Sequence, residues 1–159
     1  NAARFARHPM GFVASPGHPL LKKKKVTLAD VVQANLLVRE RGSGTRTAVE
    51  KLFKEAGHPL NFGSEVSSNE AIKRMVAAGL GLGFLSVHAC ALEFEAGLIR
   101  LLPMQGNPVE ADWHIMHLAE HPIAKVAAAF QDFVIEQGQA LVQRELEAFY
   151  RPLPGRRKS

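Results

Sequence analysis

Residues 39–46, with the sequence Arg-Glu-Arg-Gly-Ser-Gly-Thr-Arg, have the composition of an anion-binding turn. They follow an apolar run and precede a helical pattern, so backbone amides at the start of that helix would point outward with partial positive charge. Hydroxyls and guanidinium groups of this segment can donate further hydrogen bonds to a carboxylate or phosphate. An ordinary helix cap with flexible glycines and solvated arginines is the alternative interpretation. The candidate ligand-binding residues here are Arg41, Gly42, Ser43, Gly44, Thr45 and Arg46.

A second polar turn, formed by Ser67, Ser68 and Asn69, opens the next helical pattern and completes the candidate site. Ser67 and Glu70 are three positions apart, which predicts a capping box in which each side chain satisfies a backbone amide of the other. Capping alone would also explain these residues. In an open parallel sheet, however, ligands bind beyond the carboxyl ends of the strands, where both turns are expected to lie.

Patterns for catalysis, metal ligation or cofactor binding do not accompany these turns. Gly44 is followed by Thr-Arg rather than the Lys-Ser/Thr of a phosphate-binding P-loop, and no Gly-x-Ser-x-Gly elbow is present. The glycines at 79, 81 and 83 follow a helix and precede a strand, the reverse of a dinucleotide fingerprint. The seven histidines lack metal-ligand spacing, and Cys90 has no nearby ligand partner. The sequence predicts a binding site without catalytic residues, metal or cofactor, and therefore not an enzyme.

The spacing of apolar residues predicts an α/β domain with a largely parallel sheet. Strands are expected at 12–14, 36–38, 82–85, 98–102 and 113–118, with an extended stretch at 62–66. Helices are expected at 28–32, at 45–56, from 67 through Val76, at 88–95 and at 123–149, the last one broken near Gly138. The Pro- and Arg-rich tail from Arg151 is expected to be disordered.

Composition places the chain among globular domains. With 159 residues, 47% hydrophobic and 22% charged, it can form one domain with one core. No apolar run approaches the roughly 20 residues of a membrane helix, and the first residues do not resemble a signal peptide. A single cysteine excludes an internal disulfide and favours a cytoplasmic location. The net charge of +5 comes partly from runs at 22–25 and 156–158, which we interpret as solvated rather than as a phosphate-binding patch.

Four segments, in this order and spacing, resemble the effector-binding domain of LysR-type bacterial transcriptional regulators. Residues 12–20 resemble a strand and His-Pro-Leu turn of that domain, and residues 39–46 resemble its Arg-Glu-x-Gly-Ser-Gly-Thr-Arg turn. Residues 68–82 resemble its Ser-Asn-Glu-Ala-Ile-Lys helix and the following strand, while Trp113 and residues 129–133 resemble its late strand and closing helix. The resemblance covers roughly residues 12–138 and is nearest to the regulators of carbon-dioxide-fixation operons.

This resemblance implies a fold like that of type 2 periplasmic binding proteins, with two α/β lobes and a hinge of two crossing strands. Residues 1–15 would end the first lobe and form the first hinge strand, and 16–112 would form the second lobe. Residues 113–150 would form the second hinge strand and a helix returning to the first lobe, followed by a disordered basic tail at 151–159. Most of the first lobe would lie outside this chain. The family's ligand occupies the cleft between the lobes, so the two polar turns would form one of its walls.

The implied function is that of an effector-sensing domain, in which a small anionic metabolite controls DNA binding. Promoter DNA would be contacted only through an N-terminal winged helix-turn-helix outside this chain. The protein would be a cytoplasmic homodimer or homotetramer with no membrane partner. A solute-binding protein of a transport system, sharing the fold, is the alternative. An enzyme on a two-lobed fold, such as a dehydratase or deaminase, would need an acid–base pair that the sequence does not show.

Overall fold

The computed structural model describes residues 1–149, with their side chains through residue 144. These residues form two compact units, Pro9–Val109 and a second unit made of Asn1–His8 with the segment from Glu110 onward. Strand β1 (Ala2–Ala14) contributes to both units. Within the described part of the chain, no helix combines the length and apolar character needed to cross a membrane.

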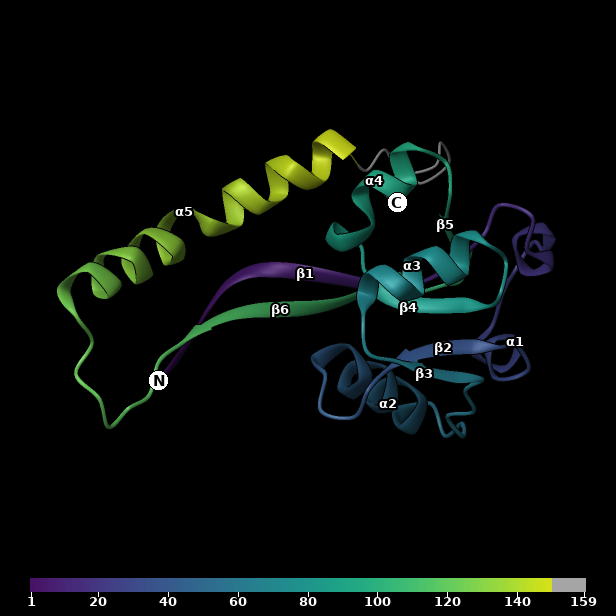
Figure 1. The fold of residues 1–159 in the computed structure, drawn as a ribbon, viewed down its shortest axis with the longest axis horizontal. Helices are drawn as coiled ribbons and strands as arrows, with labels where there is room; N and C mark the ends of the chain where they lie inside the picture. The colour runs from purple at the N-terminus through teal and green to yellow at the C-terminus, as the bar shows by residue number, and fades with distance from the viewer. Residues whose placement is uncertain (150–159) are drawn as a thin grey trace. The chain divides into compact units, whose positions relative to one another are not determined.

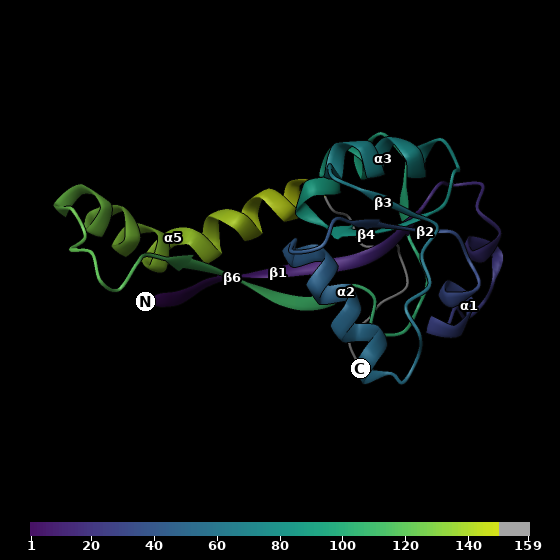
Figure 2. The ribbon, with the colours of Figure 1, turned by 60° about the horizontal axis from the view of Figure 1, so that its bottom comes forward.

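The Pro9–Val109 unit contains a five-stranded mixed sheet with helices on both faces (Figures 1 and 2). Its strands lie in the order β3-β2-β4-β1-β5, with β2 parallel to β3 and β4, and β1 antiparallel to β4 and β5. Its later strands are β2 (Leu36–Arg39), β3 (Ser64–Val66), β4 (Leu82–Ser86) and β5 (Arg100–Leu101). Its helices are η1 (Pro19–Lys22), α1 (Leu28–Val32), α2 (Gly44–Glu55), α3 (Asn69–Ala77), η2 (His88–Cys90) and α4 (Ala91–Glu95).

The expected α/β class is confirmed, but the sheet is less parallel than predicted. Only the segment β2-α2-β3-α3-β4 contains helical crossovers, and such crossovers are what make neighbouring strands parallel. Strand β1 is also much longer than the predicted run at 12–14, because its first half lies in the other unit. The strand expected at 98–102 is reduced to the two residues of β5.

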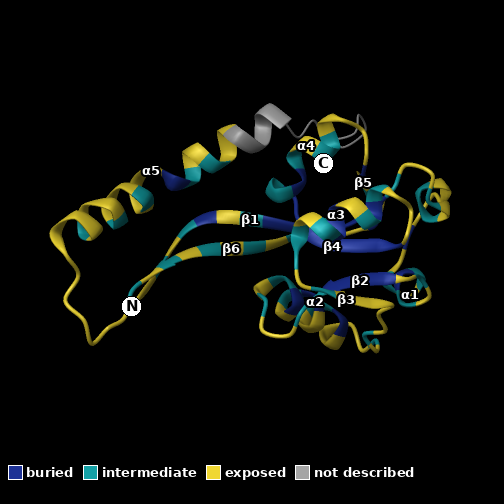
Figure 3. Cartoon of the chain, in the orientation of Figure 1, coloured by how far each residue is buried: buried dark blue, intermediate teal, exposed yellow. Residues whose placement is uncertain are grey.

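Helices α2 and α3 pack on opposite faces of this sheet (Figure 2). Phe53 of α2 meets Phe12 of β1 edge-on, with ring centroids 6.2 Å apart. On the other face, Ile72 and Val76 of α3 are fully buried against β4. At Gly83 of β4, a Cβ atom would lie 3.1 Å from both of these side chains, so glycine permits the close approach of α3. Val49 and Phe53 of α2 are likewise buried against the sheet, and Figure 3 shows that β2 and β4 are buried.

Asn107 joins the end of this unit to strand β1. Its side chain, on a residue only 4% exposed, accepts a hydrogen bond from the Phe12 amide and donates to the carbonyls of Phe12 and Leu102. The distances are 2.9, 3.2 and 2.9 Å. The Leu102 amide also donates to the Phe12 carbonyl, and the Met104 amide to the Leu102 carbonyl. It is therefore the Phe12 amide that depends on Asn107 for its hydrogen bond.

The second unit contains the first half of β1, strand β6 (Val109–Met116) and helix α5 (Lys125–Phe149). Strand β6 pairs with β1, and Trp113 on β6 packs against Phe5 and His8 of β1. The predicted break of α5 near Gly138 is wrong. A Cβ at this position would lie 2.7 Å from the Phe5 ring, so glycine lets the continuous helix pass close to β1. The predicted disorder from Arg151 falls outside the described residues.

Candidate functional site

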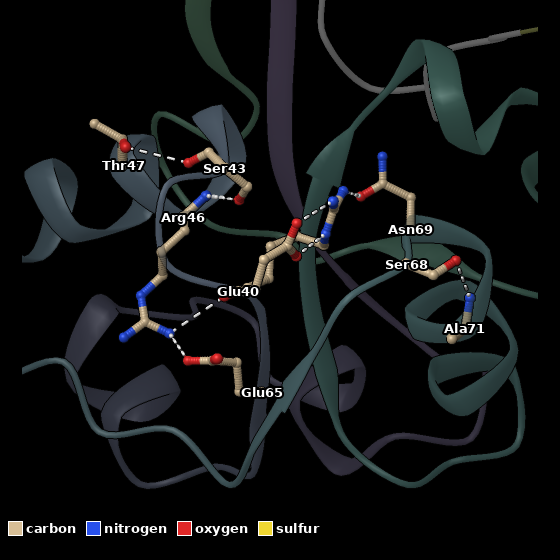
Figure 4. Close-up of polar contacts among 9 residues, drawn as sticks. Glu40, Ser43, Arg46, Thr47, Glu65, Ser68, Asn69 and Ala71 are labelled. Carbon is tan, nitrogen blue, oxygen red and sulfur yellow. Dashed lines mark hydrogen bonds and ion pairs between the residues drawn. The ribbon is translucent and has the colours of Figure 1, made fainter.

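The two polar turns lie side by side at the carboxyl edge of the parallel strands (Figure 4). Arg39, the last residue of β2, pairs with Val66, the last residue of β3. Helix α2 starts soon after Arg39 and α3 soon after Val66. The positive ends of two helices therefore converge on neighbouring positions, as the parallel topology requires.

The first turn is shaped by Ser43. Its hydroxyl accepts a hydrogen bond from the Arg46 amide at 3.0 Å, and its own amide donates to the Glu40 carbonyl. The preceding Gly42 has a positive φ of 90°, a conformation that glycine adopts without strain. The amides of Gly44 and Thr45 lie in the first turn of α2, where the helix itself offers no acceptor. Both amides are therefore open to an acceptor from outside the helix.

The second turn differs from the prediction by one residue. Ser68, in an extended conformation, caps α3 by accepting from the Ala71 amide, so the helix starts at Asn69. The capping box expected between Ser67 and Glu70 is therefore wrong, because β3 extends to Val66 and leaves Ser67 before the cap. Glu70 instead pairs with Lys73 at 2.7 Å. The amides of Asn69 and Glu70 are the outward-facing pair at this helix start.

Arg39 connects the two turns, and the sequence-based site did not include it. Its Nη1 donates to the Asn69 side-chain oxygen at 2.6 Å, while Nε and Nη2 hold the Glu40 carboxylate at 2.7 and 2.8 Å. These hydrogen bonds raise the pKa of Arg39 and lower the pKa of Glu40. In the sequence, the signal for Arg39 is an arginine at the end of a buried strand, directly before a polar turn. The glycine-rich residues after it match an anion-binding turn more closely, so the predicted site started at Arg41.

The two other arginines of the turn have different environments. Arg46 is 4% exposed, and its guanidinium contacts Glu50 at 2.6 Å, Glu65 at 3.7 Å and the Phe62 ring. It also donates to the Arg39 carbonyl at 3.4 Å. In Figure 4 the labelled Glu40 lies between Arg46 and Asn69. Arg41 is exposed and has no ion-pair partner among residues 1–144. Direct ligand contact by either arginine stays a prediction.

Lys73 and Cys90 lie behind the second turn. Lys73 is 6% exposed, contacts Glu70 and Glu93, and donates to the Ala89 carbonyl, which ties α3 to the segment after β4. Burial raises the pKa of the Cys90 thiol to about 12, and Glu93 adds to this. A thiol in this environment stays protonated at neutral pH and is a packing residue rather than a nucleophile.

A separate open cavity of about 420 Å³ lies at the opposite, amino end of β2 and β4. Its lining includes His18, Lys23, Asp30, Asn35 and Gly81. Lys23 and Asp30 neutralise each other at 2.6 Å, so the cavity presents no unpaired charge to an anion. Among the described residues, no cluster of histidine, cysteine and carboxylate side chains could hold a metal ion.

Solved ligand-binding domains of bacterial regulators have a similar fold. The regulatory domain of CcmR from Synechocystis, solved in complex with 2-PG, superimposes with a TM-score of 0.77 at 29% identity, over 86% of this chain and 65% of that one. The effector-binding domain of QuiR, in complex with shikimate, gives a TM-score of 0.75 at 20% identity, over 87% and 65%, and supports the fold alone.

The model of the LysR substrate-binding domain matches residues 1–139, so the chain belongs to the LysR family of transcriptional regulators. It is 39% identical over 141 residues to the transcriptional activator CmpR of Synechocystis sp., covering 89% of this chain and 46% of that protein. It is 41% identical over 137 residues to CbbR of Xanthobacter flavus, covering 85% and 41%. CfxR of Cupriavidus necator is 36% identical over 153 residues, covering 96% and 47%. The chain thus spans less than half the length of these relatives.

These findings confirm the predicted family and the type 2 periplasmic-binding-protein-like fold. They also confirm the predicted similarity to regulators of carbon-dioxide fixation, and they do not favour a transport protein. The relatives are transcriptional regulators rather than enzymes.

Proposed function

We propose that the carboxyl edge of β2 and β3 binds a small anionic metabolite and that this binding controls the regulator that carries the chain. The observation that supports this proposal is the convergence of two capped helix starts, α2 and α3, on one sheet edge. Four outward-facing amides, from Gly44, Thr45, Asn69 and Glu70, can donate to a carboxylate or phosphate there. Together with the hydroxyls of Thr45 and Ser67, these amides make the site suitable for an anion with several oxygens.

The ligand class follows from this chemistry and from one relative. CcmR binds 2-PG, which carries both a phosphate and a carboxylate, and its domain is 29% identical to this chain. Two adjacent helix starts suit a molecule with two anionic ends, since each end can face one helix dipole. We propose 2-phosphoglycolate as the first compound to test, followed by phosphorylated sugars, nicotinamide nucleotides and small dicarboxylates.

The binding event would act on DNA from a distance. In the complete protein, we propose a cytoplasmic homodimer or homotetramer that contacts promoter DNA through an N-terminal winged helix-turn-helix. Allosteric control requires that the anion bind one protomer arrangement more tightly than another. The residues of the proposed site include no pair of side chains positioned for general acid and base catalysis, which favours sensing over catalysis.

Replacing Thr45 with alanine is expected to weaken binding of 2-phosphoglycolate by about 10-fold, because one hydrogen bond to a charged ligand is lost. Isothermal titration calorimetry on the complete regulator measures this change. Thr47→Ala is the matched control. Thr47 lies two positions further along α2, and its hydroxyl donates to the Ser43 carbonyl. Its replacement should leave the affinity unchanged.

An equal loss of affinity in both variants would mean that helix stability, rather than the Thr45 hydroxyl, controls binding. Absence of saturable binding to every anion of the panel, in a folded protein, would refute the proposed function.

A further inference from the structure

We propose that Glu40 is a built-in competitor for the effector: its carboxylate occupies Arg39 in the ligand-free state, and an anionic effector takes its place. This inference rests on the proposed function and adds a regulatory device to the same site. It assigns a ligand-gripping role to Arg39 and an opposing role to its neighbour.

The geometry of the pair supports this exchange. Arg39 presents Nε and Nη2 to the two Glu40 oxygens at 2.7 and 2.8 Å. This two-pronged arrangement is the one that guanidinium groups form with free carboxylates and phosphates. Glu40 therefore occupies the edge of Arg39 that is best suited to bind an effector anion.

Arg39 is held in place independently of Glu40. Its backbone pairs with Val66 in the sheet, and its carbonyl accepts a hydrogen bond from Arg46. Its Nη1 donates to Asn69 at the start of α3 at 2.6 Å. With only 18% of its side chain exposed, the guanidinium is fixed between the two helix starts. It would keep its position after losing Glu40.

Glu40, in contrast, is easily released. It lies in the turn after β2, and its side chain is 38% exposed. Among residues 1–144, Arg39 is its only side-chain partner. Once displaced, its carboxylate can be hydrated by solvent at small cost, because partly exposed ion pairs contribute little to stability.

An incoming anion can form more hydrogen bonds beside Arg39 than the Glu40 carboxylate forms there. Beside Arg39 lie the outward-facing amides of Asn69 and Glu70, which face away from their own helix. A phosphate or carboxylate on Arg39 can accept hydrogen bonds from these amides as well, whereas the Glu40 side chain is bonded to Arg39. Because Arg39 also holds Asn69, an anion on this guanidinium would lie beside the start of α3.

The consequence is measurable as a gain of affinity on removing a carboxylate. The complete regulator carrying Glu40→Gln is expected to bind 2-phosphoglycolate about 5-fold more tightly than the wild type, since the competing ion pair is absent. Glu50→Gln is the matched control. It removes the same charge from the same unit, but Glu50 pairs with Arg46 rather than Arg39. The affinity of the Glu50→Gln variant for 2-phosphoglycolate should stay within about 2-fold of the wild type.

A double-mutant cycle completes the test. Arg39→Gln should weaken binding, and Glu40→Gln should have no further effect in that background. The competitor role of Glu40 would be overturned if the wild type binds the anion and Glu40→Gln binds it no more tightly. It would also be overturned if Glu50→Gln gains as much affinity as Glu40→Gln. Both outcomes would leave the proposed function intact. A gain that persists without Arg39 would overturn the competitor role too. Absence of binding in both the wild type and Glu40→Gln would overturn both proposals.

Discussion

Replacing Asn107 with leucine is expected to lower the free energy of unfolding by about 1–3 kcal/mol, because the buried Phe12 amide loses its partner. The carbonyls of Phe12 and Leu102 each lose one hydrogen bond but keep another from a backbone amide. Leucine fills a similar volume, so the loss reports unsatisfied hydrogen bonding rather than a cavity. Urea denaturation of the complete protein measures the change.

The aspartate variant separates hydrogen bonding from packing through its pH dependence. Asn107→Asp keeps the acceptor for the Phe12 amide but turns a second oxygen toward two carbonyls. Burial and these carbonyls should raise the folded-state pKa of the new carboxyl above its unfolded value of about 3.9. Relative to the wild type, the variant should therefore be least destabilised near pH 4 and become more destabilised as pH rises toward 7.

Asn61 provides the control, because it is exposed in a loop of the same unit. Asn61→Asp should show the wild-type pH dependence. If Asn107→Asp were as stable as the wild type at pH 7, the buried hydrogen bonds of Asn107 would not be important for this fold.

Replacing Arg46 with leucine is expected to lower the free energy of unfolding by about 1–3 kcal/mol, through loss of hydrogen bonds and packing at a buried site. The guanidinium joins α2 to β3 through Glu65, to the β2 backbone through Arg39, and to the Phe62 ring. Glu50 and Glu65 are about half exposed, so they are rehydrated after the change and add little to the cost. Arg41→Leu, in the same turn but exposed, should have no measurable effect on stability.

Arg46→Lys distinguishes a structural role from ligand contact. Lysine keeps the charge but cannot form the planar, two-pronged contacts of arginine. If Arg46 supports the turn, stability should fall, and affinity for 2-phosphoglycolate should change less than in Thr45→Ala. A large loss of affinity at unchanged stability would instead show that Arg46 grips the ligand.

In the Pro9–Val109 unit, helices could be predicted where a capping residue or a glycine marks their ends. Helix α1 has the predicted bounds, and α2 starts one residue early and ends before Gly57, whose φ is +69°. The error at Ser67 arose because two adjacent serines can both cap a helix. Only the end of β3 decides between them.

Long-range contacts explain what the sequence did not show. Gly138 is an expected helix breaker, but its role depends on Phe5, more than 130 positions away. The contact of Arg39 with Asn69 depends on the pairing of β2 with β3, which places the start of α3 beside β2. The position of Arg46 in the motif likewise does not reveal that its side chain packs against Phe62.

Amide hydrogen exchange on the complete regulator, with and without 2-phosphoglycolate, tests directly whether the anion binds at the two helix starts. The first-turn amides of α2 and α3 lack helical acceptors and should exchange rapidly without ligand. The anion is expected to slow exchange in peptides covering residues 42–47 and 67–71. Protection confined to residues 18–35 and 79–81, which line the opposite cavity, would contradict this expectation, as would binding that leaves both helix starts unprotected.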